Sequence, residues 1–221
     1  MVDRKFSIAR RWSNQVLKKY APYFSGSVVN VSAKLDFDRV DMNYREYFTN
    51  ARSYQITNHD VYESEAQIRQ NEIKLDLEEE LREELIAGFD VVFNHTTLEH
   101  IFHVEKAFSN LCRLAKEAVI VVVPFSQQQH VAATYYDYWR FTPYSLERMF
   151  EDNGFTLVVT EYNDSFNGAI YLLGIGIRDD KLADYPLFTK VNLKEKRKPP
   201  GRLIGATLTE VIKHLRSRWK K

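Results

Sequence analysis

The chain has 221 residues, of which 44% are hydrophobic, and its 31 basic and 30 acidic side chains leave a formal net charge of +1. A chain of this size can bury one sizeable core, so we expect a single domain with short appendages. The near-neutral charge argues against a nucleic-acid-binding protein, which would carry a basic excess to neutralise phosphates.

The N-terminal stretch predicts an amphipathic helix. Between residues 4 and 24, apolar side chains recur at spacings of three and four, with arginines and lysines between them. We assign residues 1–26 to this segment, which either packs over the edge of a sheet or contacts a membrane or partner surface. The first residues are charged and lack the apolar run of a signal peptide. We therefore expect a cytoplasmic protein without a membrane-spanning helix.

Apolar runs at residues 28–31 and 89–93 predict strands of a sheet. Polar residues follow these runs, most clearly at 94–97, and open α/β sheets bind ligands at the carboxyl ends of their strands. The glutamate-rich residues 78–84 predict a solvent-exposed helix. The aspartates between 36 and 41 lack the glycine and glutamate of a calcium loop, and no zinc spacing occurs. We therefore predict no metal site.

The second half of the chain continues the alternation of helices and strands. Helical spacing predicts a helix over 104–116, and a β-branched run predicts a strand over 118–123. A long polar and aromatic loop follows to residue 138, and loops of this length are often functional. Thr142 before Pro143 predicts the start of a helix that ends near Gly154. Residues 155–161 and 169–177 then predict two paired strands.

The last forty residues predict a linker followed by a basic amphipathic helix, which we assign together as residues 181–221. That helix either packs on the domain, forms a homo-oligomer, or lies on an anionic membrane. The single cysteine, Cys112, cannot form an internal disulfide, and its helical spacing indicates core packing.

Two longer stretches carry a resemblance to a known family. The sequences FDVVFNHTTLEHIFHVEKAFSNLCRLAKEAVIVVVPF and YYDYWRFTPYSLERMFEDNGF resemble class I S-adenosylmethionine-dependent methyltransferases. The second is similar to methyltransferases associated with glycan and cell-surface polysaccharide loci. The resemblance covers residues 27–180, and it implies S-adenosylmethionine as cofactor. It also implies an α/β Rossmann-like fold with a mostly parallel seven-stranded sheet, a C-terminal antiparallel hairpin and helices on both faces.

The resemblance also implies which residues hold the cofactor. The family has an acidic residue and a glycine-rich turn after its first strand, matched here by Asn30 and by the glycine-free Ser32-Ala33-Lys34. The acid that binds the cofactor ribose is matched by Asn58, with Asp60 as an alternative. The carried-over cofactor positions are Asn30, Ser32, Ala33, Asn58, Asp76, Asn94 and His95.

Methyl transfer to a hydroxyl needs a base, and we expect His95, His130 or Asp137 to serve as one. Hydrogen bonding within the turn is the alternative for His95. The resemblance places the long loop over the acceptor, so we expect Tyr136, Trp139 and Arg140 to contact it. For Arg140, pairing with an internal carboxylate is an equal alternative.

Two functions follow from these expectations. The first is a methyltransferase acting on a sugar or other small polar acceptor, with a small-molecule or glycan partner. The second is a non-catalytic relative that serves as a scaffold or partner subunit, because the first loop lacks glycine and two expected acids are asparagine.

Overall fold

The computed structural model describes residues 8–40, 42–59, 72–127, 129–133, 135–163 and 170–195. The expected basic helix within 201–221, and the membrane or oligomer contact assigned to it, lie outside these residues, as does Asp60. Within the described part of the chain, no helix combines the length and apolar character needed to cross a membrane.

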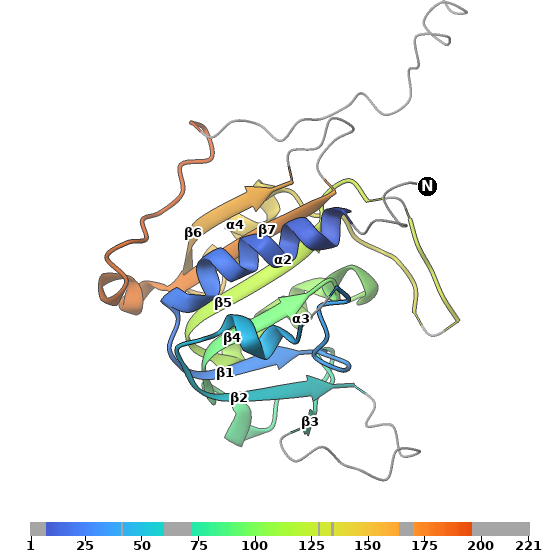
Figure 1. The fold of residues 1–221 in the computed structure, drawn as a ribbon, viewed down its shortest axis with the longest axis horizontal. Helices are drawn as coiled ribbons and strands as arrows, with labels where there is room; N and C mark the ends of the chain where they lie inside the picture. The colour runs from blue at the N-terminus through green and yellow to red at the C-terminus, as the bar shows by residue number, and fades with distance from the viewer. Residues whose placement is uncertain are drawn as a thin grey trace, which may run out of the picture.

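The core of the molecule is a seven-stranded sheet with the order β3-β2-β1-β4-β5-β7-β6. Its first five strands in this order are parallel, and β7 is antiparallel to both of its neighbours, β5 and β6. Figure 1 shows β1, β2 and β4 pointing toward the same edge of the molecule. The strands are β1 (Gly26–Val31), β2 (Ala51–Asn58), β3 (Glu72–Lys74), β4 (Phe89–His95), β5 (Ala115–Pro124), β6 (Phe155–Tyr162) and β7 (Tyr171–Arg178).

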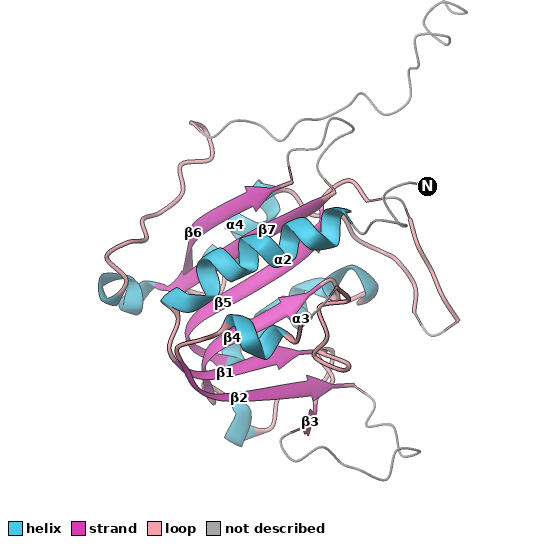
Figure 2. Cartoon of the chain, viewed as in Figure 1, coloured by secondary structure: helices cyan, strands magenta, loops and turns pink. Residues whose placement is uncertain are grey.

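This arrangement is a Rossmann-like methyltransferase fold, so the fold expected from the sequence is confirmed. The α-helices, drawn in cyan in Figure 2, are α2 (Ile8–Tyr20), α3 (Val104–Leu114) and α4 (Pro143–Glu151). The 3₁₀ helices are η1 (Ala21–Tyr23), η2 (Tyr44–Tyr47), η3 (Glu83–Leu85), η4 (Leu98–His100) and η5 (Asp179–Asp184).

Alternate residues of the central strands divide between two hydrophobic cores, as the period of two in a strand requires. On one face, α2 and η2 pack against Val28, Val91 and Ile120. On the other, α3 and α4 pack against Val29, Val92 and Val121. Because both faces are covered, the strands read as continuous apolar runs, which is why the sequence located them.

No α-helix lies in the described part of the connection between β1 and β2, which consists of a loop and the short η2. Tyr44 and Phe48 fill the space on this face by packing against Phe93, with ring centroids 5.2 and 5.9 Å away. Asp36 fixes the loop, because it accepts hydrogen bonds from Asn30, Tyr54 and the backbone of Arg45.

Two helix predictions need correction. Residues 78–84 form turns that lead into η3, because the nearby Leu81 and Leu85 are buried and Asn110 donates hydrogen bonds to the carbonyls of Leu77 and Glu79. These side-chain bonds replace helical backbone bonds. The helix predicted over 104–116 ends at Leu114, and β5 begins at the next residue.

The start of α4 is confirmed, since Thr142 accepts a hydrogen bond from the backbone of Ser145 in a capping box. Gly154 adopts a φ of 73° after the helix. Farther along, Phe188 and Val191 are buried, so residues 181–195 pack on the domain.

Candidate functional site

The candidate site lies at the carboxyl edge of the parallel strands, between β1 and β4. The strand order reverses there, and such switch points bind ligands in open α/β sheets. Five of the six described non-glycine residues with positive φ lie in the loops after β1 and β4. They are Ser32, Lys34, Asp36, Arg39 and Thr96. Backbone strain of this kind concentrates at functional sites.

The loop after β1 has a glycine-like backbone without glycine. Ser32 and Lys34 have φ values of 59° and 55°, at the two positions matched to the family's glycines. The loop is tied to the end of β2, because the amides of Ala33 and Lys34 donate to Thr57 O at 3.0 Å and Asn58 Oδ1 at 2.6 Å. The left-handed conformation is therefore held by bonds to the neighbouring strand.

Asn30, Asn58 and Asp76, three of the expected cofactor residues, have partners within the protein. Asn30 Nδ2 donates to Asp36 Oδ1 at 2.8 Å. Asn58 Nδ2 donates to Lys34 O at 3.1 Å, so its amide brackets that residue's backbone. Asp76 Oδ2 lies 3.1 Å from His59 Nε2. These residues lie at or just after the carboxyl ends of β1, β2 and β3, and their polar atoms stabilise the loops there.

Asn94 lies at the switch point itself and is fully buried. Its Nδ2 donates to Val31 O at 2.9 Å, which joins β4 to β1. Its Oδ1 has no hydrogen-bond partner among the described residues. A buried acceptor of this kind is rare in folded proteins and indicates a donor from a ligand or water.

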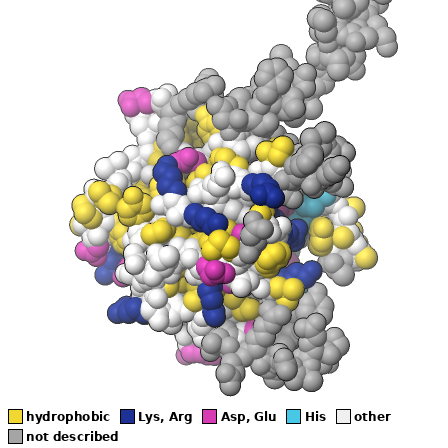
Figure 3. All heavy atoms as spheres, in the orientation of Figure 1, with side chains coloured by type: hydrophobic (Ala, Val, Ile, Leu, Met, Phe, Trp, Pro, Cys, Tyr) yellow, Lys and Arg dark blue, Asp and Glu magenta, His cyan; other side chains and the backbone are white. Residues whose placement is uncertain are grey.

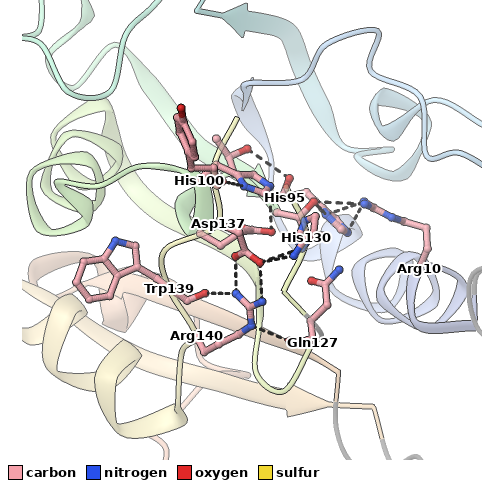
Figure 4. A network of polar contacts seen from close by, with 12 residues as sticks. Arg10, His95, His100, Gln127, His130, Asp137, Trp139 and Arg140 are labelled. Atoms are coloured by element: carbon pink, nitrogen blue, oxygen red, sulfur yellow. Dashed lines mark hydrogen bonds and ion pairs between the residues drawn. The ribbon is translucent and has the colours of Figure 1, made fainter. Parts of the chain in front are cut away.

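His95, the first candidate base, is held by residues of α2. Its Nε2 lies 3.0 Å from Ser13 Oγ, and its Nδ1 lies 2.7 Å from Arg10 Nη1. Burial and then the positive charge of Arg10 lower the pKa of His95 well below its usual range. His95 is therefore a neutral imidazole, enclosed under α2, as Figure 4 shows. Sequence reasoning found the histidine and missed Arg10 and Ser13.

Three further side chains meet beside this network. Glu99 and His100 of η4 and His130 of the long loop place one potential ligand atom each within 4.8 Å of one another. Glu99 is fully buried, and burial raises the pKa of its carboxyl to about 8. His100 Nδ1 lies 2.6 Å from Tyr136 O. These residues share no sequence motif, because Glu99 and His100 belong to η4 whereas His130 lies in the long loop after β5.

Asp137 and Arg140 form a charge pair in the long loop. Arg140 donates to both carboxylate oxygens of Asp137 at 2.6 and 2.7 Å, and to Gln127 O at 2.9 Å. These hydrogen bonds lower the pKa of Asp137 to about 2, so it is a weak base that fixes the loop. The alternative expectation for Arg140, pairing with an internal carboxylate, matches this contact.

Aromatic side chains cover the outside of the same loop. Tyr136 is 69% exposed and lies near Tyr138, which contacts Phe102 at a centroid distance of 5.4 Å. Trp139 is anchored through Nε1, which donates to Ile101 O at 2.9 Å. In Figure 3, hydrophobic side chains gather near a histidine at the edge toward which β1 and β2 point. This surface suits stacking on a flat apolar ligand face.

A separate hollow of about 550 Å³ lies at the opposite end of the sheet, with Ile86, Ala87, Lys116 and Arg178 in its wall. Arg178 donates to the carbonyls of Cys112, Ala115 and Lys116, so it caps the end of α3. Because the strained loops and the buried histidine lie at the other edge, we place the candidate site there.

The fold of this chain is the Rossmann-like α/β fold that methyltransferases have. No protein-family model and no curated protein matches the sequence. The similarity to solved structures is in the fold, and their sequences are 16% identical or less to this chain in the examples that follow.

The solved structures that resemble this chain are methyltransferases with different acceptors. Magnesium protoporphyrin IX methyltransferase of Synechocystis PCC 6803, with bound S-adenosylmethionine, is 12% identical at a TM-score of 0.54, covering 80% of this chain and 84% of its own. The 1,6-didemethyltoxoflavin-N1-methyltransferase of Burkholderia thailandensis is 16% identical at 0.56, covering 77% and 78%. A putative methyltransferase in a complex with the Haloferax volcanii Trm112 activator is 11% identical at 0.57, covering 79% and 92%.

Proposed function

We propose that the protein is a methyltransferase that uses S-adenosylmethionine to methylate a sugar or another small polar acceptor. The observation that carries this proposal is the buried, unpartnered Oδ1 of Asn94 at the switch point. The cofactor carries an ammonium group and hydroxyls, which can donate to such an acceptor. The left-handed backbone of Ser32 and Lys34 supports a close approach of the first loop to this ligand.

The acceptor side of the proposal depends on the long loop. Tyr136 offers an exposed ring, and Trp139, three residues along the chain, is anchored to Ile101 O. Sugars present flat apolar faces to aromatic rings and hydroxyls to polar groups, so both features fit a glycan acceptor in surface-polysaccharide biosynthesis. The expected base is His95, whose neutral imidazole can accept a proton at Nδ1 once Arg10 moves away from that atom.

The test is calorimetric titration of the full chain with S-adenosylmethionine and S-adenosylhomocysteine. We expect binding in the micromolar range and a loss of about tenfold in Asn94→Ala, equal to one hydrogen bond of about 1.4 kcal/mol. Asn110→Ala is the matched control, because Asn110 is equally buried but binds backbone carbonyls far from the switch point. Equal cofactor affinities in both variants would mean that Asn94 does not contact the cofactor.

The second candidate is a non-catalytic scaffold that has kept the sheet. It is favoured by the internal hydrogen bonds of Asn30 and Asn58, which occupy two positions where the family has acids. This candidate predicts no heat of binding with either cofactor form, from protein shown to be folded by circular dichroism. Methyl transfer from labelled S-adenosylmethionine to a panel of sugars and nucleotide sugars would exclude it.

A further inference from the structure

A group of buried polar atoms lies between η4 and the long loop. Neither carboxylate oxygen of Glu99 has a hydrogen-bond partner among the described residues, and the same holds for His130 Nδ1. Gln127 Oε1, in the same loop, is a third residue with an unpartnered buried atom. A buried carboxylate without a partner costs several kcal/mol, so folded proteins pair such groups with a donor, an ion or a metal.

One of the two histidines beside Glu99 is oriented as metal ligands usually are. His100 Nδ1 donates to Tyr136 O at 2.6 Å, which leaves the lone pair on Nε2, 3.8 Å from Glu99 Oε1. A backbone carbonyl often fixes the tautomer of a metal-binding histidine in this way. His130 Nδ1 lies 3.3 Å from Asp137 Oδ2 without a hydrogen bond between them.

Hydrogen bonds hold the carboxylate of Asp137, which lies beside these buried polar atoms, in a fixed orientation. Arg140 and the backbone amide of His130 both donate to Asp137, so this carboxylate cannot turn toward Glu99. Figure 4 shows His100 of η4 close to His130 and Asp137 of the long loop, and the two imidazole centroids are 4.9 Å apart. Glu99 thus provides the one free carboxylate among these side chains.

We propose that Glu99, His100 and His130 bind a divalent transition-metal ion such as Mn²⁺ or Zn²⁺. One carboxylate and two imidazoles form a ligand set that leaves coordination positions open for an oxygen of a substrate. Ligand atoms at about 2.0 to 2.2 Å from an ion lie roughly 3 to 3.5 Å apart, so small side-chain rotations close the present separation.

The role of this ion in methyl transfer rests on the proposed function. The ring centroid of Tyr135, in the aromatic loop, lies 4.4 Å from that of His100. An ion held by Glu99, His100 and His130 would make a coordinated acceptor hydroxyl more acidic. Loss of that proton to water, with a bond from the oxygen to the methyl carbon and cleavage of the sulfur–methyl bond, would yield a methyl ether and S-adenosylhomocysteine.

The test is titration of the full chain with MnCl₂ and with ZnCl₂ in the absence of any methyl donor. We expect one ion per chain with micromolar or tighter affinity, and a loss of more than about 100-fold in Glu99→Gln, since even outer partners of metal ligands contribute 10- to 100-fold. The matched controls are His103→Ala and Glu105→Gln, which change exposed residues just beyond the site and should bind within twofold of wild type.

Thermal unfolding supplies a second readout. Glu99→Gln without metal should melt near the wild-type temperature, because glutamine closely matches the size and shape of the neutral carboxyl side chain, yet its melting temperature should not rise with metal. If that variant fails to fold, His130→Gln on the loop serves instead. Wild-type affinity weaker than about 1 mM for both ions, or unchanged affinity in the variant, would refute the site. Since no donor is present, the result is independent of cofactor binding.

Discussion

Replacing Lys34 with glycine should stabilise the protein and preserve or improve donor affinity. Lys34 is exposed, its φ is 55°, and its side chain forms no ion pair with the described residues. The left-handed region costs a non-glycine residue about 1 to 2 kcal/mol. Glycine itself lowers the free energy of unfolding by about 0.5 to 1 kcal/mol, because it loses more conformational freedom on folding.

The net gain is about 0.5 to 1 kcal/mol, which corresponds to a rise in melting temperature of roughly 1 to 4 °C for a domain of this size. Lys34→Ala is the matched control, because alanine removes the same side chain and keeps the backbone penalty. Scanning calorimetry should therefore rank glycine above alanine and wild type. An alanine variant as stable as the glycine variant would refute the strained-loop argument, and a large loss of donor affinity in Lys34→Gly would mean that the lysine contacts the ligand.

Two further perturbations test the interior. The pKa of buried His95 is well below its unfolded value, so the unfolded chain binds more protons in acid and stability should fall as the pH drops below about 6.5. His95→Gln should flatten the melting temperature between pH 7.5 and 5.5, and an unchanged slope would contradict the neutral imidazole. Gly176→Ala should cost about 1 to 3 kcal/mol in urea unfolding, because the new Cβ would lie 2.3 Å from the Phe150 ring. Gly154→Ala, with open space but a φ of 73°, should cost about 1 to 2 kcal/mol, and equal costs for both would argue against this packing.

The fold could be predicted largely because its signals are local. The β-branched run at 118–123 and the Thr142 cap each depend on a few neighbouring residues, and both elements form as expected. The helix prediction for the glutamate-rich segment 78–84 was wrong, because Asn110 of α3 donates hydrogen bonds to backbone carbonyls of this region. No local sequence pattern encodes that contact. The prediction that α3 continues to residue 116 was wrong for a similar reason, since Arg178 of β7 donates to the carbonyl of Cys112 near the end of the helix.

For the candidate site, only its position at the carboxyl ends of the strands could be predicted from the sequence. His95 follows an obvious buried strand, whereas Arg10 approaches it from a helix 85 positions earlier, where it looked like one of several solvated arginines. Glu99 and His100 lay at the expected start of a helix and His130 was expected as a base, but no sequence pattern joined the three residues. Only the sheet, which brings the ends of β4 and β5 together, makes them neighbours.

The way in which the long loop is attached affects how this protein can diverge. Tyr138 and Trp139 donate their amides to Glu99 O, and Phe141 donates to Pro124 O, so the anchors are main-chain atoms. Any residue except proline can make such bonds. The exposed side chains of Tyr136 and Tyr138 can therefore change without loss of these bonds, whereas Asp137, Trp139 and Arg140 also hold the loop through their side chains. Variation confined to the two exposed tyrosines thus alters the surface of the loop and leaves its path intact.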